Sequence, residues 1–402
     1  MANENLPAKV LVVDDDPTIT KKLEFELQKF EIKVIPAKDL DSALYHFNQS
    51  LFDVVIIELE FEPLPGLALV QKWRHHDNKE RTMTGMILAA GRQRKATDDA
   101  LLKELGGIEV INKPCSAVQV MPFLSRALAT KRRNMRFEEI RTTVMKLAAQ
   151  NGKVDKAIAV VEKQLVALGP KGLEIMADIY ERDGQHGEAL KVVDKMLEQN
   201  PGSIAHMNVK GRLLLQMGRH DEALKFMEEA DKAAPQNIDR INAMATLYLH
   251  MHNPDASVEK MKEIIALNPE HPDTKFEMFG RLYDFGFDEK AQALCKETTG
   301  PMEVVRHYNN KGVALSKSGN PWAAITEYER SLKFYPQFKE NYRILYNIAL
   351  ALVAEKKREN FVKALECIER ALKLEPAFEK GEKMKEMIQT ALAPKKKPAQ
   401  AS

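Results

Sequence analysis

The sequence has few cysteines, little net charge and no long apolar run. Its three cysteines, at positions 115, 295 and 367, lie too far apart for a paired zinc motif and are typical of a reduced, cytoplasmic chain. No apolar stretch approaches the ~18 residues of a membrane helix, and the first residues lack the basic-then-apolar layout of a signal peptide. Sixty basic and 58 acidic residues leave a net charge of +2, which argues against a polybasic nucleic-acid binder. These absences predict a soluble cytoplasmic protein without a membrane segment.

Sequence motifs of the common enzymes are missing as well. The chain contains no phosphate-binding glycine loop, no GxSxG nucleophile elbow and no HExxH metal motif. Its 402 residues are enough for about two or three domains, each with its own core. We therefore expect a protein that binds rather than catalyses, without a resident cofactor.

The first part of the chain, residues 8–130, alternates between short apolar runs and segments with helical spacing. Five runs predict buried strands, at residues 9–13, 33–35, 53–57, 86–88 and 109–111. Helical segments lie between them, at residues 18–30, 39–48 and 66–74. This alternation predicts a doubly wound α/β domain, in which helices cover both faces of a parallel sheet. In such a sheet the functional residues lie at the carboxyl ends of the strands.

The strands stop after about residue 130, and the rest of the chain is predicted to be helical. Between Pro122 and Gly152 there is neither proline nor glycine, so we expect one long helix whose residues 131–150 connect the two halves and run into the first repeat. The repeats are expected over residues 137–376 and a capping helix over 377–392. Residues 393–402 are expected to form a disordered tail.

Small residues recur at a fixed period in the helical half. Strings such as GQHGEAL and GRHDEAL place an alanine five residues after a glycine, and the alanines of these two strings are 34 residues apart. The seven repeat centres are Ala157, Ala189, Ala223, Ser257, Ala291, Ala324 and Ala364. A proline twelve residues after most centres ends the second helix. These prolines are Pro201, Pro235, Pro269, Pro336 and Pro376.

This pattern resembles the tetratricopeptide repeat, a helix–turn–helix unit of 34 residues. The resemblance implies an all-α solenoid of about seven repeats, in which each unit packs on its neighbours. The small residues would let the paired helices approach closely. It also implies that the partner of this chain is a protein or an extended peptide bound in the groove of the array.

The string VLVVDDDP at residues 10–17 resembles the first strand of response-regulator receiver domains. In that family an acidic pair, here Asp14 and Asp15, holds magnesium, and a lysine after the last strand, here Lys113, binds the phosphoryl group. The string FDVVIIELEFEPLPG at residues 52–66 resembles the third strand and the phosphoacceptor loop. The resemblance implies a flavodoxin-like receiver domain over residues 8–130 in a bacterial protein of two-component phosphorelay signalling.

The chain departs from the receiver pattern at the phosphoacceptor position. Glu58 stands where the family carries the phosphate-accepting aspartate, and Gly66 eight residues later fixes the register. The hydroxyl residue of the family falls at Ala89 or Ala90, and neither carries oxygen. Because phosphoryl transfer depends on positions within a fraction of an ångström, we expect it to be lost and the magnesium site at the acidic pair to be weak or lost. Whether the longer Glu58 carboxylate imitates a phosphoryl group or is a relic stays open.

Three asparagines occupy equivalent positions in the first helices of repeats. They are Asn208, Asn242 and Asn309, each three residues before a small residue that marks its repeat. By resemblance to tetratricopeptide arrays this position faces the groove, where side-chain amides hydrogen-bond the backbone of a bound peptide. Arg212 and Thr246 lie one turn further along, and Arg306 lies near the third asparagine. The arginines favour an acidic segment or a terminal carboxylate as the ligand.

Together these features predict a bacterial signalling adaptor that is not an enzyme. A receiver domain that takes up no phosphoryl group would be coupled to a repeat groove that docks a protein or peptide partner. The alternative is a phosphorylation-controlled response regulator whose output is protein binding by the repeats. A nucleic-acid-binding regulator is disfavoured, because the basic residues 131–133 and Arg136 are expected on the exposed face of the connecting helix.

Overall fold

The computed structural model describes residues 6–150, 153–269, 271 and 273–393. The chain forms two compact units, residues 1–271 and residues 272–402. The first unit contains the sheet and helices α1 to α13, and the second contains helices α14 to α20. The change from strands to helices near residue 130 therefore lies inside the first unit. Of the predicted tail, all but Ala393 falls outside the described residues, as does Gly152.

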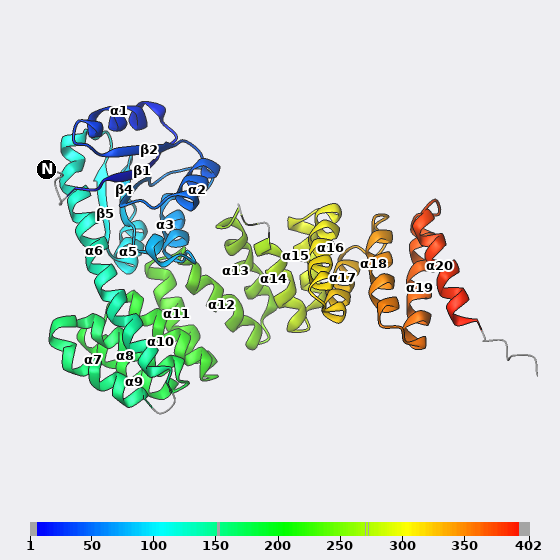
Figure 1. Ribbon diagram of the computed structural model, residues 1–402. Helices are drawn as coiled ribbons and strands as arrows, with labels where there is room; N and C mark the ends of the chain where they lie inside the picture. The colour runs from blue at the N-terminus through cyan, green and yellow to red at the C-terminus, as the bar shows by residue number, and fades with distance from the viewer. Residues whose placement is uncertain (1–5, 151–152, 270, 272, 394–402) are drawn as a thin grey trace, which may run out of the picture. The chain divides into compact units, whose positions relative to one another are not determined.

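Five parallel strands form one sheet in the first unit (Figure 1). They are β1 (Lys9–Val13), β2 (Lys33–Ala37), β3 (Val54–Glu58), β4 (Gly85–Ala90) and β5 (Ile108–Asn112), in the order β2-β1-β3-β4-β5. Val13 lies opposite Ile57, and Glu58 lies opposite Ala89, so the carboxyl ends of the central strands meet at one edge. The doubly wound α/β fold expected from the alternation of strands and helices is confirmed.

Five helices connect the strands of the sheet. They are α1 (Pro17–Gln28), α2 (Leu40–Gln49), α3 (Gly66–Arg74), α4 (Lys79–Thr82) and α5 (Ala96–Leu105). Helix α1 begins after Asp16, whose Oδ1 accepts a hydrogen bond from the Thr18 backbone N–H at 2.8 Å. The third aspartate of the DDD string is thus a helix cap, which leaves Asp14 and Asp15 for the edge of the sheet.

Helix α6 (Ala117–Ala148) belongs to both halves of the first unit (Figure 1). Its first part, including Val120 and Leu124, is buried in the core that also contains Val12 and Ile56 of the sheet. Its last part carries Val144 into a second apolar core with helices α7 and α8. One uninterrupted helix thus runs through the segment where the absence of proline and glycine predicted a connector.

The helices after α6 alternate as first and second helices of repeats. In the first unit they are α7 (Val154–Leu168), α8 (Pro170–Arg182), α9 (His186–Gln199), α10 (Ile204–Gln216), α11 (His220–Ala233), α12 (Ile238–His250) and α13 (Pro254–Ala266). In the second unit they are α14 (Asp273–Asp284), α15 (Asp288–Thr298), α16 (Pro301–Lys317), α17 (Pro321–Phe334), α18 (Asn341–Ala354), α19 (Arg358–Leu374) and α20 (Glu379–Leu392). None of the described helices combines the length and the apolar character that a membrane span requires.

The residues at the seven predicted repeat centres are completely buried. Each lies on a second helix, from α7 to α19, and exposes none of its surface. Ser257 fits among the alanines because its hydroxyl donates a hydrogen bond of 2.8 Å to the Ala245 carbonyl of the facing helix. A buried hydroxyl without a hydrogen-bond partner would cost free energy. Because Ser257 has this partner, the small side chain can replace alanine and still let α12 and α13 approach closely.

Gly312 of α16 is the clearest test of this close approach. A Cβ atom at this position would overlap the ring of Tyr328 on α17, and that ring is buried. Since the ring cannot move without opening the core, we expect Gly312→Ala to lower the free energy of unfolding by about 1–3 kcal/mol. Urea unfolding followed by circular dichroism measures this change. Gly187→Ala is the control, because its added methyl group meets no atom within 4 Å, and equal stability of the two variants would contradict the packing argument.

Candidate functional site

Three strand ends bring an acidic pocket together at the carboxyl edge of the sheet. Asp14 follows β1, Glu58 ends β3, and Lys113 follows β5. The Lys113 ammonium lies 2.8 Å from Asp14 Oδ2 and 2.7 Å from Glu58 Oε1. All three side chains are largely buried, exposing 3% in Asp14, 12% in Glu58 and 10% in Lys113. The sequence-predicted pocket residues thus meet, and one ammonium bridges two carboxylates.

The charges of this pocket shift the pKa values of its members. Burial, together with the nearby charge of Asp14, raises the pKa of Glu58 even though Lys113 donates to it. Burial by itself would lower the pKa of Lys113, but hydrogen bonds and charges from Asp14 and Glu58 raise the pKa overall. The lysine is therefore held as a cation, while two carboxylates share its single charge.

The positions that depart from the receiver pattern lie around the same pocket. Ala89 and Ala90 are buried at the end of β4 and present methyl groups, with Ala89 directly opposite Glu58. Asp53 lies before β3, at the opposite end of the strand, where it pairs with Lys131 of α6 at 3.0 Å. Asp53 is therefore far from the pocket along the strand, and Glu58 is the carboxylate at the acceptor position.

The oxygen atoms of the pocket could hold a divalent cation. One carboxylate oxygen each from Asp14, Asp15 and Glu58 lies within 4.8 Å of the others. Oxygen ligands of this kind suit magnesium. Both oxygens of Asp14 are already engaged, however, since Oδ1 accepts from the Asp16 N–H at 3.0 Å and Oδ2 faces Lys113. The donor set fits the ion in kind, and any ion there competes with an ammonium already in place.

Three of the four predicted groove residues of the first unit have side-chain hydrogen bonds within the chain. Asn208 of α10 donates to Glu104 of the receiver helix α5. Arg212 forms a two-pronged ion pair with Glu181, at 3.1 and 3.0 Å. The Thr246 hydroxyl donates to the Asn242 carbonyl, and Asn242 Oδ1 is a buried oxygen without a partner among the described residues. The two asparagines therefore differ in their surroundings.

The two remaining predicted groove residues, Arg306 and Asn309, belong to α16 of the second unit. A cavity of about 750 Å³ lies between α14 and α16, and Arg306 lines it. Arg306 is exposed and has no ion-pair partner within residues 273–393. Beside it His307 stacks on Phe276, with ring centres 3.8 Å apart. Asn309 accepts a hydrogen bond of 2.7 Å from Asn347 of α18, which joins the first helices of two successive repeats.

A buried polar cluster that the sequence motifs do not predict lies where helix α5 of the sheet domain meets helix α12. Glu104 of α5 and Arg240 of α12 are 3% and 0% exposed and lie 3.0 Å apart. Burial raises the pKa of Glu104, and the Arg240 charge opposes that shift. Arg240 lies next to Ile241 and four residues before Met244, both buried, so the helical period placed a cation near an apolar face. That signal was available from sequence, whereas the identity of its partner was not.

Two family descriptions match separate parts of the chain. The response regulator receiver domain matches residues 10–124, and the N-terminal TPR repeats region of Psidin matches residues 176–296. The chain thus carries a receiver domain at its N-terminus, followed by a region of tetratricopeptide repeats. Both resemblances drawn from the sequence motifs are confirmed.

Individual relatives match one part of the chain at a time. The virulence transcriptional regulatory protein PhoP of Salmonella typhimurium is 30% identical over 127 residues, which are 31% of this chain and 53% of that protein. The chain thus spans about half the length of the curated relatives it matches. A chemotaxis response regulator of Vibrio cholerae is 24% identical, with a TM-score of 0.27 over 30% of this chain and 98% of its own. A tetratricopeptide repeat protein of Parabacteroides merdae is 14% identical, with a TM-score of 0.34 over 63% and 99%.

The raised pKa of Glu58 predicts a pH dependence of stability. The ordinary pKa of this side chain is 4.5, and because the folded value is higher, the folded protein binds this proton more tightly than the unfolded chain does. The contribution of Glu58 to the free energy of unfolding therefore falls as the pH rises from about 4.5 through the raised pKa. Glu58→Gln cannot ionise, so the stability of the wild-type protein minus that of the variant should decrease over this range.

Tryptophan fluorescence during urea unfolding measures this effect in the receiver domain alone. Trp73 is buried in the receiver and stacks on Phe47, whereas the second tryptophan of the chain, Trp322, is 46% exposed in the other unit. Both proteins are compared in a Trp322→Phe background. A stability difference that is flat or rises with pH would show that the pKa of Glu58 is not raised.

Proposed function

We propose that this protein is a bacterial, cytoplasmic signalling adaptor in which a receiver domain without phosphoryl uptake is coupled to repeats that dock a protein or peptide. The adaptor carries out no chemical reaction of its own. The observation on which this rests is the bridged pocket, in which Lys113 lies between Asp14 and Glu58. The three free cysteines of the chain are in keeping with a reducing compartment.

The pocket geometry supports the absence of phosphoryl uptake. A phosphoryl group on residue 58 would need the ammonium of Lys113, which Glu58 already contacts at 2.7 Å through its own carboxylate. The methyl group of Ala89 offers no hydrogen bond to a transferred oxygen. With the nucleophile displaced by one methylene group, the alignment on which phosphoryl transfer depends is lost. The same contact suits both meanings of Glu58, a fixed imitation of the phosphorylated state and a relic.

A second candidate function is a regulator that is still phosphorylated. The observation that favours it is the retained cluster of Asp14, Asp15 and Glu58, which could hold magnesium weakly. A bound magnesium ion would supply charge neutralisation for a transferred phosphoryl group. For Lys113 to contact that phosphoryl group, its ion pairs with Asp14 and Glu58 would have to break.

The groove of the second unit supports the docking role. Tetratricopeptide repeats commonly bind proteins, and the cavity at α14 and α16 combines the exposed guanidinium of Arg306 with the ring of His307, which stacks on the buried Phe276. Arg281 lines the same cavity. Arginine side chains beside an aromatic face favour an acidic peptide with an apolar residue as ligand.

Incubation with acetyl phosphate and magnesium tests the receiver half of the proposal. We expect no phosphoryl adduct in the intact mass of the wild-type protein, and little on Glu58→Asp alone, because the hydroxyl at residue 89 is still missing. The double variant Glu58→Asp, Ala89→Thr restores both groups and should gain a phosphoryl group at residue 58. A stoichiometric adduct on the wild-type receiver domain would instead establish the phosphorylated regulator.

Charge reversal in the groove tests the docking half. Full-length protein is applied to an array of acidic, neutral and basic decapeptides, and we expect the acidic peptides to be retained. Arg306→Glu should weaken the best of these by about tenfold to a hundredfold, as expected for a lost charged hydrogen bond. Arg370→Glu serves as the matched control, because Arg370 is also an exposed arginine but lies on α19, the second helix of its repeat. Equal losses in both variants, or none, would place the binding surface elsewhere.

A further inference from the structure

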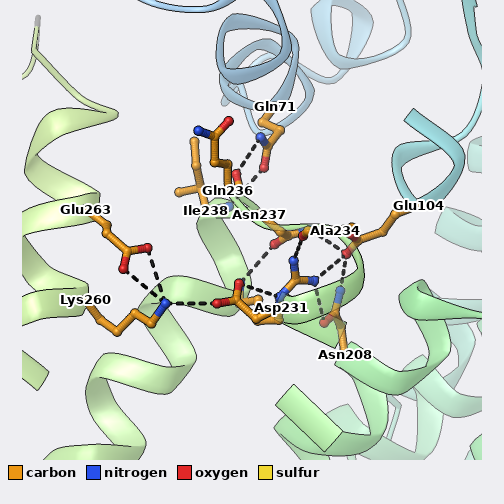
Figure 2. A network of polar contacts seen from close by, with 11 residues as sticks. Gln71, Glu104, Asn208, Asp231, Ala234, Gln236, Asn237, Ile238, Lys260 and Glu263 are labelled. Carbon is orange, nitrogen blue, oxygen red and sulfur yellow. Dashed lines mark hydrogen bonds and ion pairs between the residues drawn. The ribbon is translucent and has the colours of Figure 1, made fainter. Parts of the chain in front are cut away.

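The receiver domain contacts the repeats through a carboxylate that three donors share (Figure 2). Glu104 Oε1 accepts hydrogen bonds from the side-chain amide of Asn208, from that of Asn237 at 2.7 Å, and from Arg240 Nη1 at 3.0 Å. Asn208 comes from α10, whereas Asn237 caps α12 and Arg240 lies in its first turn. One receiver side chain thus accepts hydrogen bonds from the first helices of two successive repeats and from the cap of the second of these helices.

Contacts inside the repeats hold these donors in position. Arg240 donates to the Ala234 carbonyl through Nη2 and to Asp231 through Nε at 3.2 Å, and Asp231 also accepts from Lys260 at 2.9 Å (Figure 2). Asn237 accepts from the Arg240 backbone N–H at 2.9 Å, which directs its amide group toward Glu104. The repeats therefore present a preformed site for a carboxylate, and the receiver supplies the carboxylate.

A second receiver helix contacts the same end of α12. The Gln71 amide of α3 donates to the Gln236 carbonyl at 3.0 Å and accepts from the Ile238 N–H at 2.9 Å. His75, at the end of α3, lies 3.0 Å from Asp239. Gln71 is 2% exposed, so its hydrogen bonds to the backbone are shielded from water. The receiver thus covers the beginning of α12 with side chains that imitate peptide groups.

The contact is polar and incompletely packed. Glu104 Oε2 is buried without a hydrogen-bond partner among the described residues. A cavity of about 640 Å³ lies beside Glu104, between the loop after α5 and helices α6, α8 and α10. Polar contacts of this kind are typical of surfaces that separate, because each group can find water or another partner when they open.

We propose that the receiver domain occupies a partner-binding face of the repeats in cis, with Glu104 in the place of an acidic residue of the partner. The covered face is the site formed by Asn208, Asn237 and Arg240. A partner with an acidic segment takes this site when the receiver leaves it. The inference rests on the docking role proposed above and adds that part of the array is closed by the chain itself.

Hydrogen exchange of the full-length protein tests whether Glu104 keeps this face closed. Glu104→Ala should speed exchange in residues 96–105, 204–216 and 238–250 by roughly a hundredfold, because three donors lose their shared acceptor and Arg240 loses one of its two carboxylate partners. Exchange in the strands β1, β3 and β4 should not change. Glu109→Ala is the matched control, since this receiver glutamate pairs with Arg126 and makes no hydrogen bond or ion pair with the described residues of the repeats. It should leave exchange in the repeats unchanged.

Binding of a decaglutamate peptide tests the ligand class. Glu104→Ala should bind it about tenfold more tightly than the wild-type protein at the same ionic strength, and further substitution Arg240→Ala should abolish the gain. A decaglutamine peptide should show no such difference. The proposal is overturned by unchanged exchange and affinity in Glu104→Ala, by faster exchange throughout the receiver strands, or by local opening without a gain in decaglutamate binding. Loss of peptide retention in Arg306→Glu, with Glu104 intact, reports separately on the docking role.

Discussion

The arrangement of the first unit depends on the buried pair of Glu104 and Arg240. Two charges without access to water are costly, and here the cost is offset because one carboxylate oxygen collects three donors and the guanidinium has further acceptors in Asp231 and the Ala234 carbonyl. Such a pair adds little net stability compared with apolar packing, but it penalises every misaligned docking. The pair thus favours one orientation of the receiver on the repeats. An apolar contact surface of the same size would allow several orientations of similar free energy.

Helix α6 gives this weak polar contact its strength. The helix leaves the receiver core at Leu128 and enters the repeat core at Val144, so the receiver is covalently held next to the face it covers. An intramolecular ligand acts at a high effective concentration, which a free acidic peptide has to match. A site with an unsatisfied oxygen and a neighbouring cavity can therefore remain closed in the chain, although the same contact between separate proteins would be weak.

Much of this structure could be predicted from local patterns, and the part that could not depends on distant pairs. The five strands, the acidic pocket and the seven repeat centres follow from short apolar runs, from motifs at strand ends and from a period of 34 residues. Glu104 lies in an ordinary charged turn of α5, and nothing near it in sequence separates it from a solvated glutamate. Its partner is 136 residues away. Asn208 was predicted to bind the backbone of a peptide partner, and in the structure its amide donates to Glu104 of the same chain.

The pocket and the covered face are joined through the segment between β4 and α5. Arg92 of this segment pairs with Glu60, just after the acceptor position, and with Asp98 of the helix that carries Glu104. In a receiver that is phosphorylated, a removable group at residue 58 could act on such a connection. Under the proposed function Glu58 takes up no removable phosphoryl group, so the pocket supplies no phosphorylation-dependent input to α5. Energetic linkage between two sites works in both directions. Reversible control of the docked receiver then has to come from the repeats, where a partner competes with Glu104 for the same donors. If the receiver takes up no phosphoryl group, as proposed, its fold still has a use, because it holds the Glu104 carboxylate of α5 against the donors of the repeats.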